Sequence, residues 1–363
     1  MRSCTVCSSP AGRARRAIEP AGRSESGLVS RLPHRLLNAW YEGAPPPWWT
    51  RVLEPVYRAV VRLRRRAYRR AWLASGHPGR PVIVIGNLTA GGAGKTPLAA
   101  WLAGVLAQRG LQPAIVSRGY GGAEPAQPHR VSENDDPAFS GDEPLLLVRI
   151  AACPVWICRD RLAAAEAAVA AGADVIVADD GLQHYRLQRD FEIAVVDGAR
   201  GLGNGRCLPA GPLREPATRL KSVDFVVCNG AGADCPGGAL EMRLEGDEAV
   251  RMDGAARRPL ASFAGERVHA VAGIGHPERF FALLESRGLA LIRHPLPDHG
   301  EVPEDLLRPP DGLPVLMTSK DAMRCLGRPA AAGAWQVPVS ARLAEAGRPL
   351  LERLAQRLAI GEA

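Results

Sequence analysis

Residues 86–96, Gly-Asn-Leu-Thr-Ala-Gly-Gly-Ala-Gly-Lys-Thr, combine the residue types that bind a nucleotide phosphate. They follow the apolar run 82–85 and precede a helical stretch, which is the strand, glycine-rich loop and helix start of a phosphate-binding loop. Lys95 would reach the β- and γ-phosphates, and the Thr96 hydroxyl would bind Mg²⁺. The usual pattern has a glycine at the position of Thr89, so the match is incomplete. The predicted nucleotide-binding residues are Thr89, Ala90, Gly91, Gly92, Ala93, Gly94, Lys95 and Thr96.

Lys95 is also unusual in this chain because only three of its 46 basic residues are lysines, at positions 95, 221 and 320. The sequence uses arginine almost everywhere that a cation is needed. A lysine at the phosphate position therefore indicates a need for a compact point charge rather than a planar guanidinium.

The segment 175–184 is a hydrophobic run that ends in Asp179 and Asp180. Paired carboxylates after a buried strand are typical of the group that holds Mg²⁺ near the γ-phosphate in phosphoryl transfer. Asp-Asp-Gly is also a good turn sequence, so the motif alone leaves a structural role open. In a chain with a phosphate-binding loop, the metal-binding interpretation is favoured.

Other polar segments could contribute to a site, although each also has an ordinary structural explanation. Residues 141–144 (Gly-Asp-Glu-Pro) contain Asp142 and precede a helix, where acids and proline are common for capping alone. Residues 117–122 (Ser-Arg-Gly-Tyr-Gly-Gly) form either a flexible turn or a substrate loop. His299 could supply a base from a second domain, and the segment 318–321 could hold a surface ion pair.

The elements that must position these residues follow an α/β pattern from residue 81 onward. Short apolar runs predict buried parallel strands at 82–85, 114–116, 155–157, 175–178, 193–196 and 225–227. Helical stretches rich in alanine and leucine, at 97–109 and 161–171, end at glycines. The predicted α/β fold is a P-loop NTPase-like, doubly wound, mostly parallel sheet.

A second, smaller α/β domain is expected because glycine-rich turns and short alternating runs at 231–259 indicate a linker. Its predicted elements are strands at 268–272, 289–292 and 315–317 and a helix at 280–287. A chain of 363 residues has room for two domains. The expected organisation is a disordered tail at 1–36, a helical segment at 37–80, a P-loop domain at 81–235 and a C-terminal α/β domain with linker strands at 236–363.

Residues 48–72 predict an N-terminal amphipathic helix. At about 100° per residue, one sector carries Leu53, Val56, Val60, Leu63, Ala67 and Ala71. The opposite side carries Arg51, Arg58, Arg62, Arg65 and Arg69. No run of about 18 apolar residues occurs, so a membrane-spanning helix is not predicted. The helix either lies in an anionic membrane surface or packs on its own domain with solvated arginines.

The distribution of charges and cysteines argues against a nucleic-acid enzyme and against a zinc-binding protein. Residues 1–80 carry a net charge of +12 and residues 81–363 carry −4, although the total is +8. Because a nucleic-acid enzyme places basic residues on its body, no nucleic-acid partner is predicted. The eight cysteines are scattered. Cys4 and Cys7 form a lone Cys-x-x-Cys pair, where neither zinc binding nor redox chemistry is expected. The others are interpreted as buried apolar side chains in a reducing compartment.

Taken in order, these motifs resemble those of the tetraacyldisaccharide 4′-kinase family. The resembling segments lie at 86–97, 117–122, 141–144, 178–184, 211–216, 272–281 and 297–299. The resemblance extends over residues 37–325, and family members look similar at Thr89, with a small hydroxyl residue in place of the first glycine. Two positions depart from the family pattern, because Ser319 replaces a glutamate and Gly300 replaces a second histidine.

The resemblance implies roles for individual residues. The implied catalytic residues are Asp142 as base toward the sugar hydroxyl, His299 as its partner, Lys95 and Asp180. The implied ligands of Mg²⁺, the cofactor used with ATP, are Thr96, Asp179, Asp180 and Glu215. The implied substrate contacts are Ser117, Arg118, Tyr120 and Arg214. A base and a partner on different domains also imply closure of the cleft over the γ-phosphate.

The resemblance further implies an acylated glucosamine disaccharide 1-phosphate as acceptor and the 1,4′-bisphosphorylated lipid A precursor, lipid IVA, as product. It favours an anionic membrane surface as partner of the helix at 48–72, at the cytoplasmic face of the bacterial inner membrane. No oligomeric state is predicted. The main alternative is a partitioning-type ATPase switch, which shares residues 91–96 but has a lysine where this chain has Ala90. A weaker alternative is a cytosolic small-molecule kinase.

Overall fold

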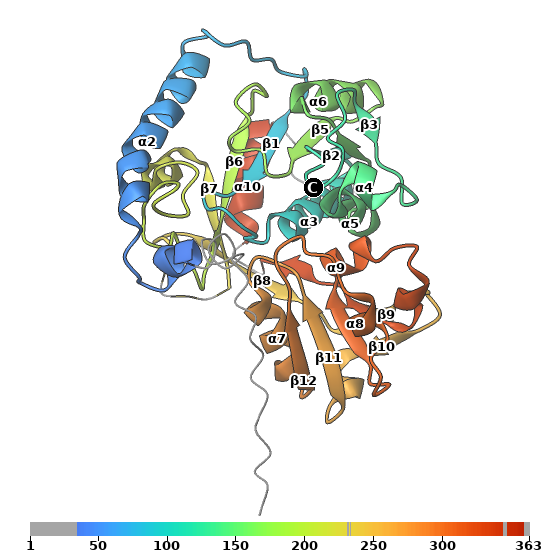
Figure 1. The fold of residues 1–363 in the computed structure, drawn as a ribbon. Helices are drawn as coiled ribbons and strands as arrows, with labels where there is room; N and C mark the ends of the chain where they lie inside the picture. Colours follow the sequence, from blue (N-terminus) through green and yellow to red (C-terminus); the bar gives the residue numbers. More distant parts are fainter. Residues whose placement is uncertain (1–34, 231, 233, 344–346, 359–363) are drawn as a thin grey trace, which may run out of the picture.

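A computed structural model of the chain describes residues 35–230, 232, 234–343 and 347–358. Within these residues the strands form two sheets with helices packed on them (Figure 1). The expected tail at 1–36 lies outside the described residues, except that positions 35 and 36 are helical. Cys4 and Cys7 also lie outside them.

In the described part of the chain, the larger sheet has nine strands in the order β15-β8-β7-β6-β1-β5-β2-β4-β3. Neighbours from β8 to β4 are parallel, and the edge strands β3 and β15 are antiparallel. The strands are β1 Val82–Gly86, β2 Pro113–Ser117, β3 His129–Arg130, β4 Val155–Ile157, β5 Val175–Ala178, β6 Phe191–Asp197, β7 Phe225–Asn229, β8 Leu240–Glu245 and β15 Ser340–Arg342. The predicted mostly parallel α/β sheet is confirmed.

Helices cover both faces of this sheet because its strands are apolar on both faces. α3 (Lys95–Gln108) packs against β1, β2 and β5, and α6 (Arg161–Ala170) packs against β2, β4 and β5. Alternate side chains of β1 belong to different cores, with Ile85 in the cluster of α3 and Val84 in the cluster of α6. The loop between β1 and α3 therefore lies at the carboxyl ends of the strands, where open α/β sheets bind ligands.

The second sheet has six strands among the described residues, in the order β10-β9-β14-β13-β11-β12. They are β9 Glu248–Arg251, β10 Arg257–Pro259, β11 Arg267–Ala272, β12 Ala290–Pro295, β13 Val315–Thr318 and β14 Trp335–Val337. Further helices in the described ranges are α4 Pro137–Ser140, α5 Asp142–Ile150, α7 Pro277–Ser286, α8 Glu304–Leu307, α9 Ser319–Arg324 and α10 Gly347–Leu358, with short 3₁₀ turns at Ala217–Ser222, Leu260–Phe263 and Pro329–Gly333.

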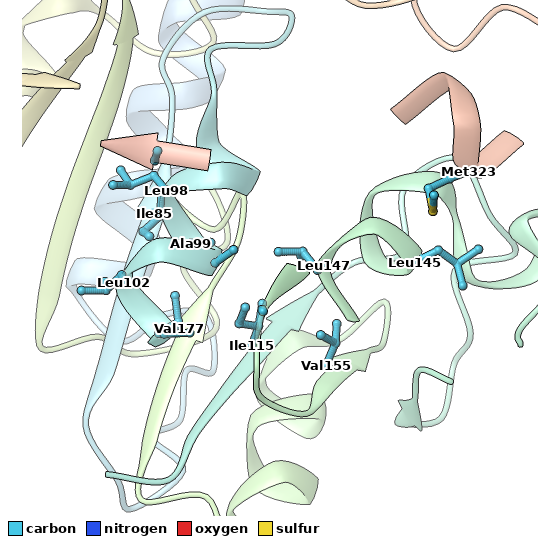
Figure 2. Packing of buried hydrophobic residues seen from close by; sticks show 14 of the residues in the cluster. Ile85, Leu98, Ala99, Leu102, Ile115, Leu145, Leu147, Val155, Val177 and Met323 are labelled. Atoms are coloured by element: carbon cyan, nitrogen blue, oxygen red, sulfur yellow. The ribbon is translucent and has the colours of Figure 1, made fainter. Parts of the chain in front are cut away.

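One hydrophobic cluster joins the two sheets. It contains Leu145 of α5 and Met323 of α9, which lie beside each other in Figure 2. It also contains Leu350 of α10, which follows the return strand β15. β8 and β15 pair with each other at one edge of the larger sheet, so the chain leaves and re-enters that sheet through adjacent strands. The larger sheet therefore uses residues on both sides of the linker predicted at 231–259.

The cysteines differ from the sequence-based expectation at one pair. Cys228 at the end of β7 forms a disulfide with Cys235, so these two are not reduced apolar side chains. The other cysteines within the described ranges are Cys153, Cys158, Cys207 and Cys325, which are free. Burial raises the pKa of each of these four thiols.

α2 (Trp48–Arg69) lies along one edge of the molecule (Figure 1). Its exposed apolar residues are Trp48, Val52, Leu53, Val56, Val60 and Leu63, and Val56 is 61% exposed. Its polar side contacts the protein, because buried Glu54 accepts hydrogen bonds from Nη1 of Arg206 (3.0 Å) and N of Cys207 (3.1 Å). In the ranges that the structure describes, no helix has the length and apolar character needed to cross a membrane.

Candidate functional site

The phosphate loop connects β1 to α3 and is braced by asparagines. Gly94 caps α3 with φ +93°, and a Cβ there would lie 2.5 Å from Nδ2 of Asn229. That Nδ2 donates to the carbonyl of Ala93 (3.1 Å), while Nδ2 of Asn87 donates to the carbonyl of Gly91 (2.9 Å). The backbone conformation and the close approach both require glycine at position 94. The loop thus leads directly into the N-terminus of α3, and a helix N-terminus favours the binding of phosphate.

Thr89 occupies the position of the usual first glycine because the backbone does not turn there. It forms an antiparallel bridge with Leu213, and its φ is not positive. The next N–H, that of Ala90, donates to the carbonyl of Pro212 (2.8 Å). A β-branched residue suits this extended backbone. The segment around Leu213 therefore holds the start of the phosphate loop in place through backbone pairing rather than through a tight turn.

Lys95 and Thr96 begin α3 and face the carboxylates that follow β5. Nζ of Lys95 lies 3.6 Å from Oδ1 of Asp180, and Oγ1 of Thr96 donates to Oδ2 of Asp179 (3.2 Å). Asp180 has φ +49°, which is unusual for a residue other than glycine. Its carboxylate also accepts from Nη1 of Arg214 at 3.2 Å. The structure brings together the lysine, hydroxyl and paired carboxylates that the motifs predicted.

Asp179 has the unpartnered oxygen that a bound cation would use. The residue is buried, and its Oδ1 has no hydrogen-bond partner. Burial, followed by the charge of Glu143, raises the pKa of Asp179 to about 7. No cluster of three or more His, Cys, Asp or Glu side chains among the described residues could hold a metal by itself. These features fit Mg²⁺, which keeps several waters and binds through one or two carboxylates plus substrate phosphates.

Mg²⁺ binding should therefore depend on pH around the pKa of Asp179. Deprotonation above pH 7 supplies the carboxylate, so raising the pH from 6 to 8 is expected to tighten Mg²⁺ binding about tenfold. Calorimetric titration of the nucleotide-free protein with Mg²⁺ at both pH values measures this. The Asp179→Asn variant should lose the dependence, and an equally steep dependence in that variant would contradict the assignment.

Asp142 and His299 come from segments that belong to different sheets, and they lie in contact. Asp142 begins α5, His299 follows β12, and Nδ1 of His299 is 3.1 Å from Oδ2 of Asp142. Burial would raise the pKa of Asp142, but the hydrogen bond with His299 and the charges of Lys320 and Arg324 outweigh it and lower this pKa. The same hydrogen bond raises the pKa of His299. Asp142 is therefore a carboxylate at neutral pH and can accept a proton.

The loop after β2 approaches this pair closely. Gly121 has φ +83°, and a Cβ there would lie 3.5 Å from Oδ1 of Asp142 and 3.6 Å from Nδ1 of His299. The ring of Tyr120 stands edge-on to His299 with centroids 5.2 Å apart, and this tyrosine is exposed. Residues of the segment 117–122 therefore form a wall of the site.

The other residues that were predicted to bind substrate or metal already contact side chains of the protein or are buried. Ser117 is buried at the end of β2, and Nε of Arg118 pairs with Glu124 (3.0 Å). Glu215 accepts a hydrogen bond from Tyr185 and lies 3.7 Å from Nε of Arg65. Within the described residues Glu215 forms no metal-binding cluster with the paired aspartates. Glu215 lines the same cavity as Asp180, and its role as an Mg²⁺ ligand stays a prediction.

Two cavities flank Lys95. The first, of about 540 Å³, is the more polar of the two, with walls that are polar and apolar in nearly equal parts, and is called the polar cavity. It is lined by residues that include Ser117, Arg118, Tyr120, Asp180, Arg214, His299 and, from α2, Tyr57, Val61 and Arg64. The second, of about 460 Å³, is mostly apolar and is lined by residues that include Asn229, Ile274, Phe280, Leu283, Val337 and Val339. Of the described residues, those that line both cavities are Gly92, Lys95, Glu143 and Lys320. The apolar cavity suits a nucleotide base and the polar cavity suits an acceptor.

Sequence reasoning missed three charged residues of the site. Arg161 begins α6, is buried, and donates from Nη2 to the carbonyl of Asp180 (3.0 Å). Nζ of Lys320 lies 3.0 Å from Oε1 of Glu143. Glu143 shares a motif with Asp142, so a signal for it existed. Arg161 and Lys320 are assigned only by their three-dimensional neighbours.

The chain is similar to known proteins over most of its length. Residues 47–359 match the model of the family described as LpxK, tetraacyldisaccharide-1-P 4′-kinase. A protein named tetraacyldisaccharide 4′-kinase from Alkalilimnicola ehrlichii is 50% identical over 333 residues, covering 89% of this chain and 97% of that protein. One of the same name from Xanthomonas campestris pv. campestris is 49% identical, covering 90% and 97%. The crystal structure of LpxK from Aquifex aeolicus in complex with ATP is similar with a TM-score of 0.67 and 26% identity, covering 84% of this chain and 97% of that one.

Proposed function

This chain belongs to the tetraacyldisaccharide-1-phosphate 4′-kinase family, and on that premise we propose that it transfers the γ-phosphate of ATP to the 4′-hydroxyl of tetraacyldisaccharide 1-phosphate. Membership makes the protein an ATP-using kinase of lipid A biosynthesis. The identity of its acceptor and product is the proposal. The product would be the 1,4′-bisphosphorylated lipid A precursor, lipid IVA.

The observation that carries the proposal is the contact between Asp142 and His299, of which His299 lines the polar cavity. We assign Asp142 as the base that accepts the proton of the 4′-hydroxyl, and His299 as the group that orients its carboxylate from the second domain. Lys95 neutralises charge on the β- and γ-phosphates. Mg²⁺ held by Thr96 and Asp179 would supply further charge neutralisation there. Binding and orientation by these side chains account for the chemistry because phosphoryl transfer needs no covalent intermediate.

The polar cavity also fits the rest of the acceptor. Ser117, Arg118, Tyr120 and Arg214 line it and would contact the disaccharide and its 1-phosphate. α2 contributes Tyr57, Val61 and Arg64 to the lining of the same cavity. An acylated sugar bound there could leave its acyl chains beside the exposed apolar side of α2.

The test is an assay of purified protein with ATP, Mg²⁺ and tetraacyldisaccharide 1-phosphate in detergent micelles. Mass spectrometry should detect a bisphosphorylated product, and the 4′-deoxy acceptor should give none. ATP hydrolysis without any phosphorylated lipid would contradict the proposal and favour the partitioning-type ATPase switch.

We further propose that α2 lies in an anionic membrane surface at the cytoplasmic face of the inner membrane. Its exposed apolar residues support this, because an amphipathic helix that packed on its own domain would bury them. The arginines contribute differently from the expectation. Nη1 of Arg58 lies 3.9 Å from Glu54 and Nε of Arg65 lies 3.7 Å from Glu215, so part of the basic side is used within the protein.

Replacing the apolar side of α2 should therefore release the protein from membranes. The combined change Val56→Ser, Val60→Ser and Leu63→Ser is expected to weaken binding to vesicles containing anionic lipid by about a hundredfold or more, because three apolar side chains lose burial. Vesicle co-sedimentation measures this. The exposed residues Phe139 and Ile150, changed to serine, provide the control. Unchanged sedimentation of the triple variant would contradict the membrane proposal.

A further inference from the structure

Lys320 connects the two domains at the site, and none of the roles above uses it. It lies in α9 directly after β13, and its side chain is 15% exposed. Nζ lies 3.0 Å from Oε1 of Glu143, 3.4 Å from Oδ1 of Asp298 and 3.1 Å from Nε2 of His299. An ammonium group has three donors and no acceptor, so these contacts use all of its hydrogen bonds.

These contacts hold the ammonium group of Lys320 in a defined position next to the pair of Asp142 and His299. Because Nε2 of His299 accepts from Lys320, Nδ1 carries the ring proton and donates it to Asp142. Glu143 lies on the first domain, whereas Asp298 and His299 lie on the second, so the cation spans the domain boundary. Lys320 is therefore placed by residues on both sides of the cleft.

The cavities place Lys320 where the phosphoryl group must cross. The apolar cavity and the polar cavity share the lining residues Gly92, Lys95, Glu143 and Lys320. A group that moves from a nucleotide in one cavity to a sugar in the other passes this shared wall. Lys95 enters the wall from the first domain and Lys320 enters it from the second.

The use of lysine rather than arginine at position 320 is informative, because the chain is rich in arginine. Of the three lysines, two line this wall and the third, Lys221, is exposed in the turn Ala217–Ser222. A compact ammonium can exchange one carboxylate for a phosphate oxygen without the planar geometry that a guanidinium imposes. The choice of lysine at both positions indicates a common requirement for a point charge.

We propose that Lys320 is a catalytic cation that the second domain supplies to the transferring phosphoryl group. The proposal rests on the proposed kinase function of the same site. When ATP is bound, the γ-phosphate oxygens replace the Glu143 carboxylate as partner of Nζ. Lys320 then stabilises the charge on the equatorial oxygens while Lys95 holds the β- and γ-phosphates.

The transfer step balances without a change at Lys320. The bond from the γ-phosphorus to the bridging oxygen breaks, and its electron pair stays on the β-phosphate of ADP. The bond from the 4′-oxygen to the γ-phosphorus forms, and the hydroxyl proton passes to Asp142. Lys320 remains protonated throughout and contributes only charge and hydrogen bonds.

The experiment compares Lys320→Met, Lys320→Gln and Lys320→Arg with Lys221→Met as the matched control. Turnover of the first two variants is expected to fall about a hundredfold, as for the loss of one transition-state donor, with little change in KM for ATP. Lys320→Arg should restore little activity. Lys221→Met should match the wild type. Thermal melting of each variant checks folding.

A binding measurement separates catalysis from a purely structural link. Lys320→Gln should bind ADP with unchanged affinity but bind the ADP–aluminium fluoride complex with Mg²⁺ at least tenfold more weakly, because only the latter resembles the transition state. Equal losses for ADP and the fluoride complex, or turnover within twofold of wild type, would overturn the proposal. Because this measurement uses no acceptor, it stands even if the wild type proves not to phosphorylate the disaccharide.

Discussion

Replacing Asp142 with asparagine is expected to lower the turnover number by about a hundred- to ten-thousand-fold, the range for loss of a general base. Asparagine keeps the shape of the side chain and can still accept from Nδ1 of His299, which lies 3.1 Å from Oδ2. It cannot take the proton of the acceptor hydroxyl. Binding of ATP should change little, because Asp142 does not line the apolar cavity.

The measurement is steady-state turnover at saturating ATP and acceptor, together with calorimetric binding of a non-hydrolysable ATP analogue. Asp247, an exposed aspartate of the second domain, provides the matched control through Asp247→Asn, which should leave turnover unchanged. Turnover of Asp142→Asn within tenfold of the wild type would remove Asp142 as the base. A folded variant that has also lost ATP binding would point to a structural role instead.

Replacing Lys95 with methionine should lower kcat/KM by about a hundred- to a thousandfold or more, because the γ-phosphate loses its principal protein cation. The side chain is buried at the start of α3 and its Nζ lies 3.6 Å from Asp180. The fold should persist because Asp180 keeps its contact with Arg214 at 3.2 Å. Initial rates at several ATP concentrations measure the effect.

Lys95→Arg tests whether charge alone is enough. The loop leaves no room for a longer, planar group, since Lys95 is only 9% exposed, so this variant is expected to remain strongly impaired. The exposed Lys221→Met serves again as control. Recovery of most activity in Lys95→Arg would show that the site needs a cation but not a compact one.

Local features of the sequence were sufficient to predict most of the fold. The strands β1, β2, β4, β5, β6 and β7 lie where short apolar runs predicted them, because parallel strands are buried on both faces and are therefore continuously hydrophobic. The pairing of β8 with β15 was not predicted. The two strands are about a hundred residues apart in the chain, and nothing in the sequence of either short strand specifies the other as its partner.

The residues of the candidate site also fall into those that sequence motifs predicted and those that they did not. Lys95, Thr96, Asp179 and Asp180 were visible as motifs, and the structure places them in contact. Asp142 and His299 were chosen through resemblance, since each motif alone also suits a cap or a loop. Glu215 stays a predicted metal ligand, and its contacts with Tyr185 and Arg65 come from other segments that its own motif does not specify.

The sequence by itself determined the phosphate loop, the strands that carry it and the family of the chain. These depend on backbone conformation and on burial patterns within a few residues, as at Gly94 with its positive φ. Only the tertiary structure decided which charges meet. Asp142 and His299 are 157 residues apart, and Glu143 and Lys320 are 177 apart. Their electrostatic interactions depend on distances of a few ångströms that arise only when the two sheets pack through one hydrophobic core.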